Sequence, residues 1–281
     1  MIDAKVILDS ISETGSRLTT IEMTFHRFVL AEFNTHRTHS RNSASSRAIP
    51  VTTQLKKVSE NPAFPLFWGS EQKGMQSGDE LTGDDLTDAQ ILFARIHDFT
   101  VAEVNEYVKS HPIDRDGKVR LHKGLLNRLL EPFMYHTVIA SSTEAGWANF
   151  FALRSSNFTK LAQPEIMAVA DLAYDGYMAS TPTLVHMGEW HTPYIREDDD
   201  FTYFESPSEA RKAVSVARCA RVSYMTHDGI RDIKEDIAMY QRLISAQPPH
   251  DSPREHVATP AMRGEDTLGN FSGWHQFRHH A

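Results

Sequence analysis

The sequence predicts one α+β domain of 281 residues. Short segments with strand-like composition or alternation lie near the two ends of the chain, at 6–8, 20–25 and 256–262, while longer apolar periods typical of amphipathic helices fill the middle. Hydrophobic residues make up 40% of the chain, enough to bury a core. We therefore expect a central antiparallel or mixed sheet combined with a helical region.

The helical periods and their start and stop signals divide this domain into five parts. Helices are expected at 28–35, 87–110, 121–131, 144–154, 164–179, 208–219, 228–246 and 268–280, with Thr87, Ser208 and Asp228 as N-caps. Residues 37–50 form a polar loop, and the proline- and glycine-rich residues 59–86 an irregular excursion. The parts are strands and helix (1–50), an insertion and helix (51–120), a helical part (121–180), a connector (181–207) and a C-terminal module (208–281).

Composition narrows the functional class. The formal net charge is −8, which argues against a general nucleic-acid binder. No apolar run is long enough to cross a membrane, and the start of the chain does not resemble a secretory leader. The single cysteine, Cys219, excludes an internal disulfide and suits a reducing cytoplasm. We expect a cytoplasmic protein with no membrane or nucleic-acid partner.

One segment departs from the acidic average. Between His26 and Arg47 the chain carries three histidines and four arginines, opposed by one acid, Glu32. A helix that ends in His36-Arg37, followed by a serine-rich loop and Arg47, can surround a phosphate, because arginine offers a bidentate fork and serine hydroxyls add short donors. On charge alone, a solvated basic loop is the competing interpretation.

The spacing in this segment resembles the signature of the flavin-dependent thymidylate synthase superfamily. That signature runs Arg-His-Arg, seven residues and then Ser, with Asn-Glu before the serine and an arginine two residues after it. Residues in register with it are His36, Arg37, Ser40, Asn42, Ser45 and Arg47. Thr35 replaces the first arginine and Ser43 the glutamate.

Other segments extend the resemblance to about two thirds of the chain. Three segments resemble segments of the family and follow the family's order: Arg128–Pro132, Asn149–Arg154 and Ala162–Ile166. Two more resemble segments that are N-terminal in the family, yet they lie near the C-terminus here: Ala220–Tyr224 and His250–His256. The simplest account is a circular permutation. Residues 271–280 then echo 28–37 as a duplicated helix, which would bring His275 and Arg278 towards the active-site cleft.

The resemblance implies a fold, an activity and a set of site residues. The activity is flavin-dependent transfer of a C1 unit from methylenetetrahydrofolate to C5 of a deoxypyrimidine monophosphate, dUMP to dTMP, with FAD as cofactor, NADPH as reductant and a homotetrameric assembly. It implies flavin contacts from His36, Arg37, Asn42, Ser252, Glu255 and His256, and nucleotide contacts from Glu32, Ser45, Arg47, Arg128 and Arg154. His36, Arg37 and Arg154 are the residues expected to act in catalysis.

Two alternatives to thymidylate formation stay open at the level of sequence. The departures at Thr35 and Ser43, and Glu32 where the family has glutamine, favour a hydroxymethylase or methylase acting on dCMP or dUMP. Thr143 and Ala145 stand where the family has further flavin contacts, so flavin binding is expected to be remodelled or weaker. A non-catalytic paralogue that keeps the fold as a nucleotide-binding subunit is the other alternative. A Cys219 nucleophile and a metal site are not expected, because neither has the neighbouring residues that such a site needs.

Overall fold

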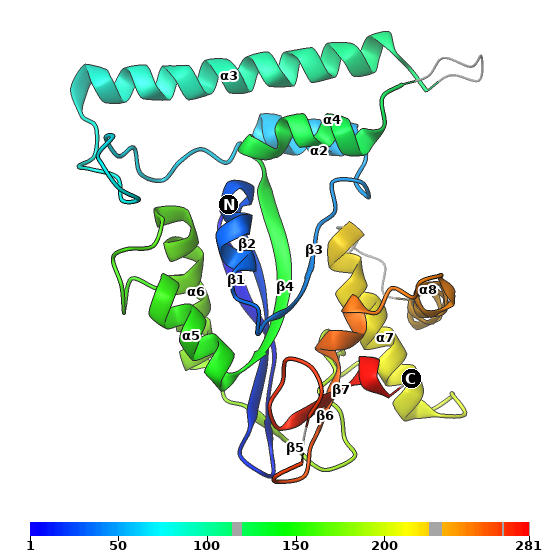
Figure 1. The fold of residues 1–281 in the computed structure, drawn as a ribbon. Helices are drawn as coiled ribbons and strands as arrows, with labels where there is room; N and C mark the ends of the chain where they lie inside the picture. Colours follow the sequence, from blue (N-terminus) through cyan, green and yellow to red (C-terminus); the bar gives the residue numbers. More distant parts are fainter. Residues whose placement is uncertain (114–119, 225–231, 266, 281) are drawn as a thin grey trace.

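A five-stranded mixed sheet forms the centre of the computed structural model, which describes residues 1–113, 120–224, 232–265 and 267–280. The strands are β1 (Asp3–Ser12), β2 (Arg17–His26), β3 (Ser40–Ser43), β4 (Tyr135–Thr143) and β5 (Thr183–Val185), in the order β3-β4-β2-β1-β5 (Figure 1). All neighbours pair antiparallel except β1 and β5. The expected α+β class and mixed sheet are confirmed.

The expectation that strands lie only near the chain ends is wrong, because β4 comes from the middle of the sequence. It pairs with β2 on one side and β3 on the other, and its residues from Val138 to Thr143 are buried. A strand covered on both faces has no polar alternation to reveal it. The short edge strand β3 was likewise expected to be loop, since its Ser-Arg-Asn-Ser sequence has no apolar position.

One face of the sheet is covered by α1 (Leu30–Asn34), α5 (Glu144–Arg154) and α6 (Pro164–Ala179). The core on this side joins sheet residues to aromatic side chains of the helices, including Phe25, Phe33, Trp147 and Phe150, all fully buried. The bounds of α5 and α6 are those expected from the sequence, because Pro164 at the first turn of α6 and the apolar periods are local signals.

The other face carries α7 (Pro207–Arg221) and, outside it, α8 (Ile233–Ser245) (Figure 1). Buried Cys219 and Val222 pack on Ile139 of β4, so the C-terminal module does lie against the central sheet. The expected cap Asp228 lies outside the described residues, and within them α8 is capped by the Asp232 side chain, which accepts from the Lys234 amide.

A separate helical layer lies beyond the end of the sheet in Figure 1. It consists of α2 (Val51–Glu60), α3 (Gly83–Ser110) and α4 (Lys123–Leu130), which share a small core of their own. The N-cap of α3 is Thr82 rather than Thr87. No helix was expected over residues 51–60, where α2 lies, and its last two residues extend into the stretch expected to be irregular. None of the described helices is both long and apolar enough to pass through a bilayer.

The expected helix at 268–280, and with it the duplicated-helix interpretation, is wrong. The segment forms β7 (Trp274–Gln276), which pairs antiparallel with β6 (Ala258–Pro260), followed by a single 3₁₀ turn, Phe277–His279. Gly273 has φ +81°, and a Cβ there would lie 2.7 Å from the Ser16 hydroxyl oxygen, so the chain turns at this glycine. Phe271, Trp274 and Phe277 are spaced as on a helix but are buried in two different clusters.

Candidate functional site

A pocket of about 850 Å³ lies where the loop after β3 meets the start of α4 and the C-terminal module. The predicted site residues that line it are Asn42, Ser45, Arg47, Ser252 and Glu255. Further lining side chains include His122, Ser223, His250, Asp251 and Arg278. The structure thus brings the basic loop together with a segment more than 200 positions away in the sequence.

Hydrogen bonds fasten the two halves of this pocket together. The Ser45 amide donates to the Ser223 carbonyl at 3.0 Å, directly after α7. On the other side of β3, Gln276 Nε2 donates to Ser40 Oγ at 2.9 Å and to the Glu255 carbonyl at 2.9 Å. These bonds hold the 3₁₀ helix Ser252–His256 against β3 without a covalent link between the segments.

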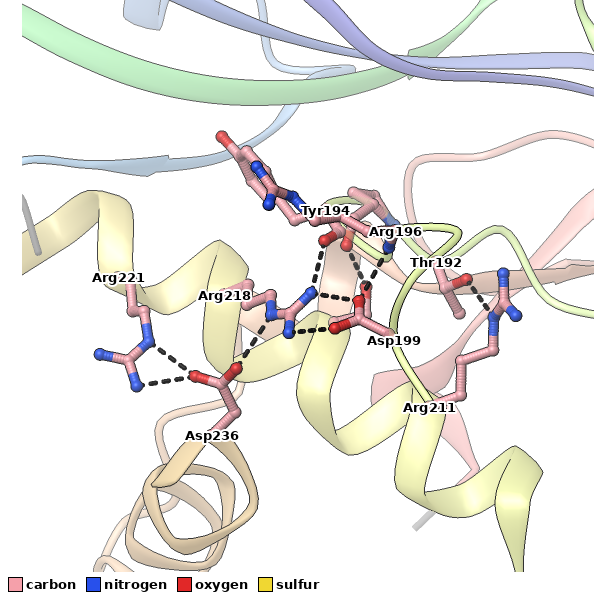
Figure 2. A network of polar contacts seen from close by, with 10 residues as sticks. Thr192, Tyr194, Arg196, Asp199, Arg211, Arg218, Arg221 and Asp236 are labelled. Atoms are coloured by element: carbon pink, nitrogen blue, oxygen red, sulfur yellow. Dashed lines mark hydrogen bonds and ion pairs between the residues drawn. The ribbon is translucent and has the colours of Figure 1, made fainter. Parts of the chain in front are cut away.

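A buried ionic network joins α7 to its neighbours, and Figure 2 shows its residues. The Arg218 guanidinium binds both oxygens of Asp199 in the connector and, through Nε at 2.9 Å, Asp236 of α8. Arg221 Nε donates to the second oxygen of Asp236 at 2.7 Å. Because Arg221 lies two residues before Ser223, the network ties the connector, α7 and α8 to the pocket wall.

Among the described residues that line the pocket, one arginine, Arg47, is left without a counter-charge. Glu255 pairs with Arg278, and Asp251 pairs with Arg254 at 3.1 Å. The exposed Arg47 guanidinium has no carboxylate partner among the described residues. Its stem lies over Gly124, where a Cβ would be only 2.9 Å from Arg47 Cγ, so glycine at the start of α4 allows the arginine to lie close. Anionic ligands are favoured at this position.

A second group of predicted residues lies outside the pocket lining. Arg154 Nε donates to His36 Nε2 at 3.0 Å, and Arg154 NH2 donates to Thr35 Oγ1 at 3.3 Å. Burial, reinforced by the Arg154 and Arg41 charges, lowers the pKa of His36 to about 4. His36 is therefore a neutral acceptor at Nε2 near pH 7, consistent with its bond from Arg154.

Arg41 lies between the two groups. Its NH1 donates to the His36 carbonyl at 3.2 Å and to the Asn34 carbonyl at 3.1 Å. Burial lowers the pKa of Arg41, and the Glu255 carboxylate opposes that shift. The Arg41 guanidinium is thus held by the carbonyl groups of Asn34 and His36, and it interacts electrostatically with Glu255 of the pocket lining.

The remaining predicted residues do not line the pocket of a single chain. Arg37 is exposed, and Arg128 is exposed on α4. Glu32 is half-buried on α1, and its Oε2 atom is buried with no hydrogen-bond partner in the described part of the chain. The roles of these residues stay predictions.

His256 is fully buried and belongs to a hydrogen-bonded chain that crosses the sheet. Its Nδ1 lies 2.8 Å from Ser141 Oγ, which lies 2.6 Å from Thr20 Oγ1; Thr20 in turn contacts His191 Nε2 at 2.8 Å. His191 Nδ1 lies 2.8 Å from Ser10 Oγ. His256 therefore ties the 3₁₀ helix Ser252–His256 to the central sheet through Ser141 of β4. Its contact with flavin stays a prediction.

Two kinds of chemistry find no support in the geometry of the described residues. Cys219 is fully buried, and burial raises the pKa of its thiol far above neutrality, so it is not a thiolate nucleophile. No cluster of three or more histidine, cysteine or acidic side chains within the described ranges has the arrangement of a metal site.

Several residues of the pocket lining were not among those predicted from the sequence. Ser223 and His250 belong to the segments Ala220–Tyr224 and His250–His256, whose resemblance to the family could have indicated that both residues lie at the site. His122 was hidden because it is the N-cap of α4, where its Nδ1 accepts from the Gly124 amide at 3.1 Å. Arg278 was expected to approach a cleft from a helix. It does line the pocket, but it lies in the 3₁₀ turn Phe277–His279 because the helix does not form.

The sequence matches no family model and no curated protein. The structure is similar to a UMP/dUMP methylase, PolB from Streptomyces cacaoi, bound with 5-Br dUMP: 16% identity, TM-score 0.43, covering 57% of this chain and 66% of that one. With 5-Br UMP bound, the same methylase gives 14% identity and TM-score 0.47, over 64% and 94% of the two chains. Thymidylate synthase X from Helicobacter pylori, solved with FAD and dUMP, gives 14% identity and TM-score 0.37, over 57% and 67%.

Proposed function

We propose that this chain binds a deoxypyrimidine monophosphate in the pocket at Arg47 and catalyses flavin-dependent reductive transfer of a C1 unit from methylenetetrahydrofolate to C5 of the base. The substrate we propose is dUMP, and the product is dTMP. We further propose that the chain belongs to the flavin-dependent thymidylate synthase superfamily in permuted order, since Ser252 and Glu255 share a pocket with Asn42, Ser45 and Arg47.

The observation that carries the proposal is the charge distribution of the pocket. Both acidic side chains of its lining are neutralised by arginines from the C-terminal module, and Arg47 has no carboxylate partner in the described ranges. Ser45, Ser223 and Ser252 add hydroxyl donors around it. A guanidinium with hydroxyl groups at the start of a helix is a combination that binds phosphate esters.

The C1 step needs electrons that the protein side chains do not supply. In this reaction the methylene carbon forms a bond to C5, the C5 hydrogen leaves as a proton, and tetrahydrofolate departs. A hydride then completes the methyl group. FAD, reduced by NADPH, would supply that hydride when bound, and His36, Arg37, Asn42, Ser252 and Glu255 are the side chains we propose to hold it. The buried Cys219 supports hydride chemistry over a thiolate route.

A complete site would need more than one chain. His36 and Arg154 bind one another, and Arg37 and Arg128 are exposed outside the pocket lining. We propose a homotetramer in which neighbouring chains bring these residues to the pocket, as the family resemblance implies.

A second candidate is a methylase or hydroxymethylase acting on dCMP. It is favoured by the Glu32 Oε2 atom, which is buried and has no hydrogen-bond partner among the described residues. A carboxylate oxygen only accepts hydrogen bonds, and the exocyclic amino group of cytosine can donate one. Uracil has a carbonyl oxygen at that position and cannot.

The test combines a spectrum with a turnover assay. The purified protein is examined for flavin absorbance and then incubated with labelled methylenetetrahydrofolate, NADPH and either dUMP or dCMP, with mass spectrometry of the nucleotide. We expect bound FAD and a product from dUMP heavier by one methyl group. Product from dCMP alone, or a hydroxymethyl product, would establish the second candidate. A colourless protein that binds nucleotide without turnover would identify a non-catalytic paralogue.

A further inference from the structure

Arg278 reaches the pocket from a segment whose backbone is firmly held. The adjacent Phe277 is buried, its amide donates to the Val257 carbonyl at 2.8 Å, and its carbonyl accepts from Arg254 NH2 at 3.0 Å. The guanidinium of Arg254 also lies 4.8 Å from the centre of the Phe277 ring. The base of the Arg278 side chain is therefore fixed, while the side chain itself is 39% exposed and lines the pocket.

The Arg278 guanidinium retains unused donors in this position. It pairs through NH1 with Glu255 Oε1, and in the described part of the chain no protein acceptor is found for its other nitrogens. A guanidinium carries five N–H donors in a planar fork suited to two oxygens of one phosphate group. Glu255 thus orients the fork and neutralises it, but leaves most of its hydrogen-bonding capacity open.

We propose that Arg278 binds a phosphate group of the pocket's ligand directly, and that Glu255 holds the guanidinium in place before the ligand arrives. This rests on the proposed function, in which the pocket binds a nucleotide at Arg47. The phosphate is either that of the substrate monophosphate or the pyrophosphate of the flavin dinucleotide, which share the same anionic oxygens.

A double variant that preserves the net charge of the pocket distinguishes two roles of Arg278: direct binding of phosphate, or neutralisation of Glu255 only. Arg278→Gln alone leaves Glu255 unpaired, so it weakens anion binding in either case. In Glu255→Gln/Arg278→Gln both charges are gone and the net charge of the pocket equals that of the wild type. If Arg278 contacts phosphate, the double variant binds about tenfold more weakly or worse. If Arg278 only neutralises Glu255, the double variant binds as the wild type does.

The measurement is calorimetric titration of the full chain with dUMP and, separately, with FAD. Weakening in the dUMP arm assigns the monophosphate to Arg278. In the FAD arm Glu255 has a proposed contact of its own, so Arg278→Lys, which keeps the charge and loses the fork, must weaken binding there too. Arg263→Gln, an exposed arginine outside the pocket lining, is the matched control. Wild-type affinity of the double variant for both ligands would overturn the inference.

The same titrations distinguish this failure from failure of the proposed function. If wild-type protein binds neither dUMP nor FAD, the pocket is not the nucleotide site and the proposed function falls. If Arg47→Ala weakens dUMP binding while the double variant does not differ from wild type, the proposed function stands and the role of Arg278 alone is lost. Circular dichroism and a thermal melt establish that each variant is folded.

Discussion

Arg47 is exposed, and no carboxylate among the described residues neutralises its charge. We expect Arg47→Ala to weaken dUMP binding by about 2–4 kcal/mol, the cost of losing a charge-assisted fork in a partly shielded pocket. The fold should persist, because the guanidinium has no hydrogen-bond or ion-pair partner among the described residues and the Arg47 amide still donates to Ser45 Oγ. Titration of dUMP into Arg47→Ala, with Arg263→Ala as control, checks this. Equal affinities in the two variants would remove Arg47 from the site.

Cys219 is a residue whose substitution we expect to leave turnover largely intact. It packs with Ile139 and Val222 in the core, and burial raises the pKa of its thiol. We expect Cys219→Ser to retain most turnover, because hydride delivery from a flavin needs no thiolate. Turnover is measured per bound flavin, with Cys219→Ala as the apolar counterpart. Complete loss of turnover in folded, flavin-loaded forms of both variants would revive a cysteine mechanism.

At the scale of elements, the connector, α7 and α8 are joined by the network of Figure 2. Arg218 is 5% exposed and Asp236 is fully buried, so removal of the arginine leaves Asp199 and part of Asp236 without their counter-charge. We expect Arg218→Leu to lower the free energy of unfolding by about 3–5 kcal/mol. Urea denaturation measures it, with Arg242→Leu on the exposed side of α8 as control. A loss no larger than in the control would show that the network adds little stability.

At the scale of the whole molecule, buried histidines link stability to pH. Burial lowers the pKa of His39, His136, His191 and His256 to about 3 each. In the unfolded chain these groups titrate near 6.5. Between those values the unfolded state binds more protons, so stability is intact above about pH 6.5 and falls as the pH decreases towards 3. Each histidine contributes up to about 1.4 kcal/mol per pH unit in that window.

The expected result is a steep fall of the urea midpoint between pH 7 and pH 5. His39 packs edge-on against Trp147, with ring centroids 4.5 Å apart, in an aromatic shell that also suits phenylalanine. His39→Phe should therefore reduce the slope of stability against pH, since it removes one of the titrating groups. A midpoint independent of pH in the wild type would contradict the assignment of these histidines as buried and neutral.

Features that depend on neighbours along the chain could be predicted from the order of residues alone. The helices α5 and α6 follow from apolar periods and a proline at the first turn, and the α+β class from the mixture of both patterns. The basic loop at 35–47 was also visible, because its arginines and serines lie within a few residues of one another. These signals are local, so no knowledge of distant segments is needed.

Contacts between distant groups could not be predicted in this way, because they depend on the folded arrangement of the whole chain. β4 is a strand because β2 and β3 pair with both its edges, and residues 274–276 form a strand because β6 is available beside them and Gly273 turns the chain. The pocket combines Arg47 with Glu255 and Arg278, while His36 and Arg154 bind each other outside its lining. Pairing and burial are set by contacts between segments far apart in the chain, and a local pattern of residue types carries no record of them.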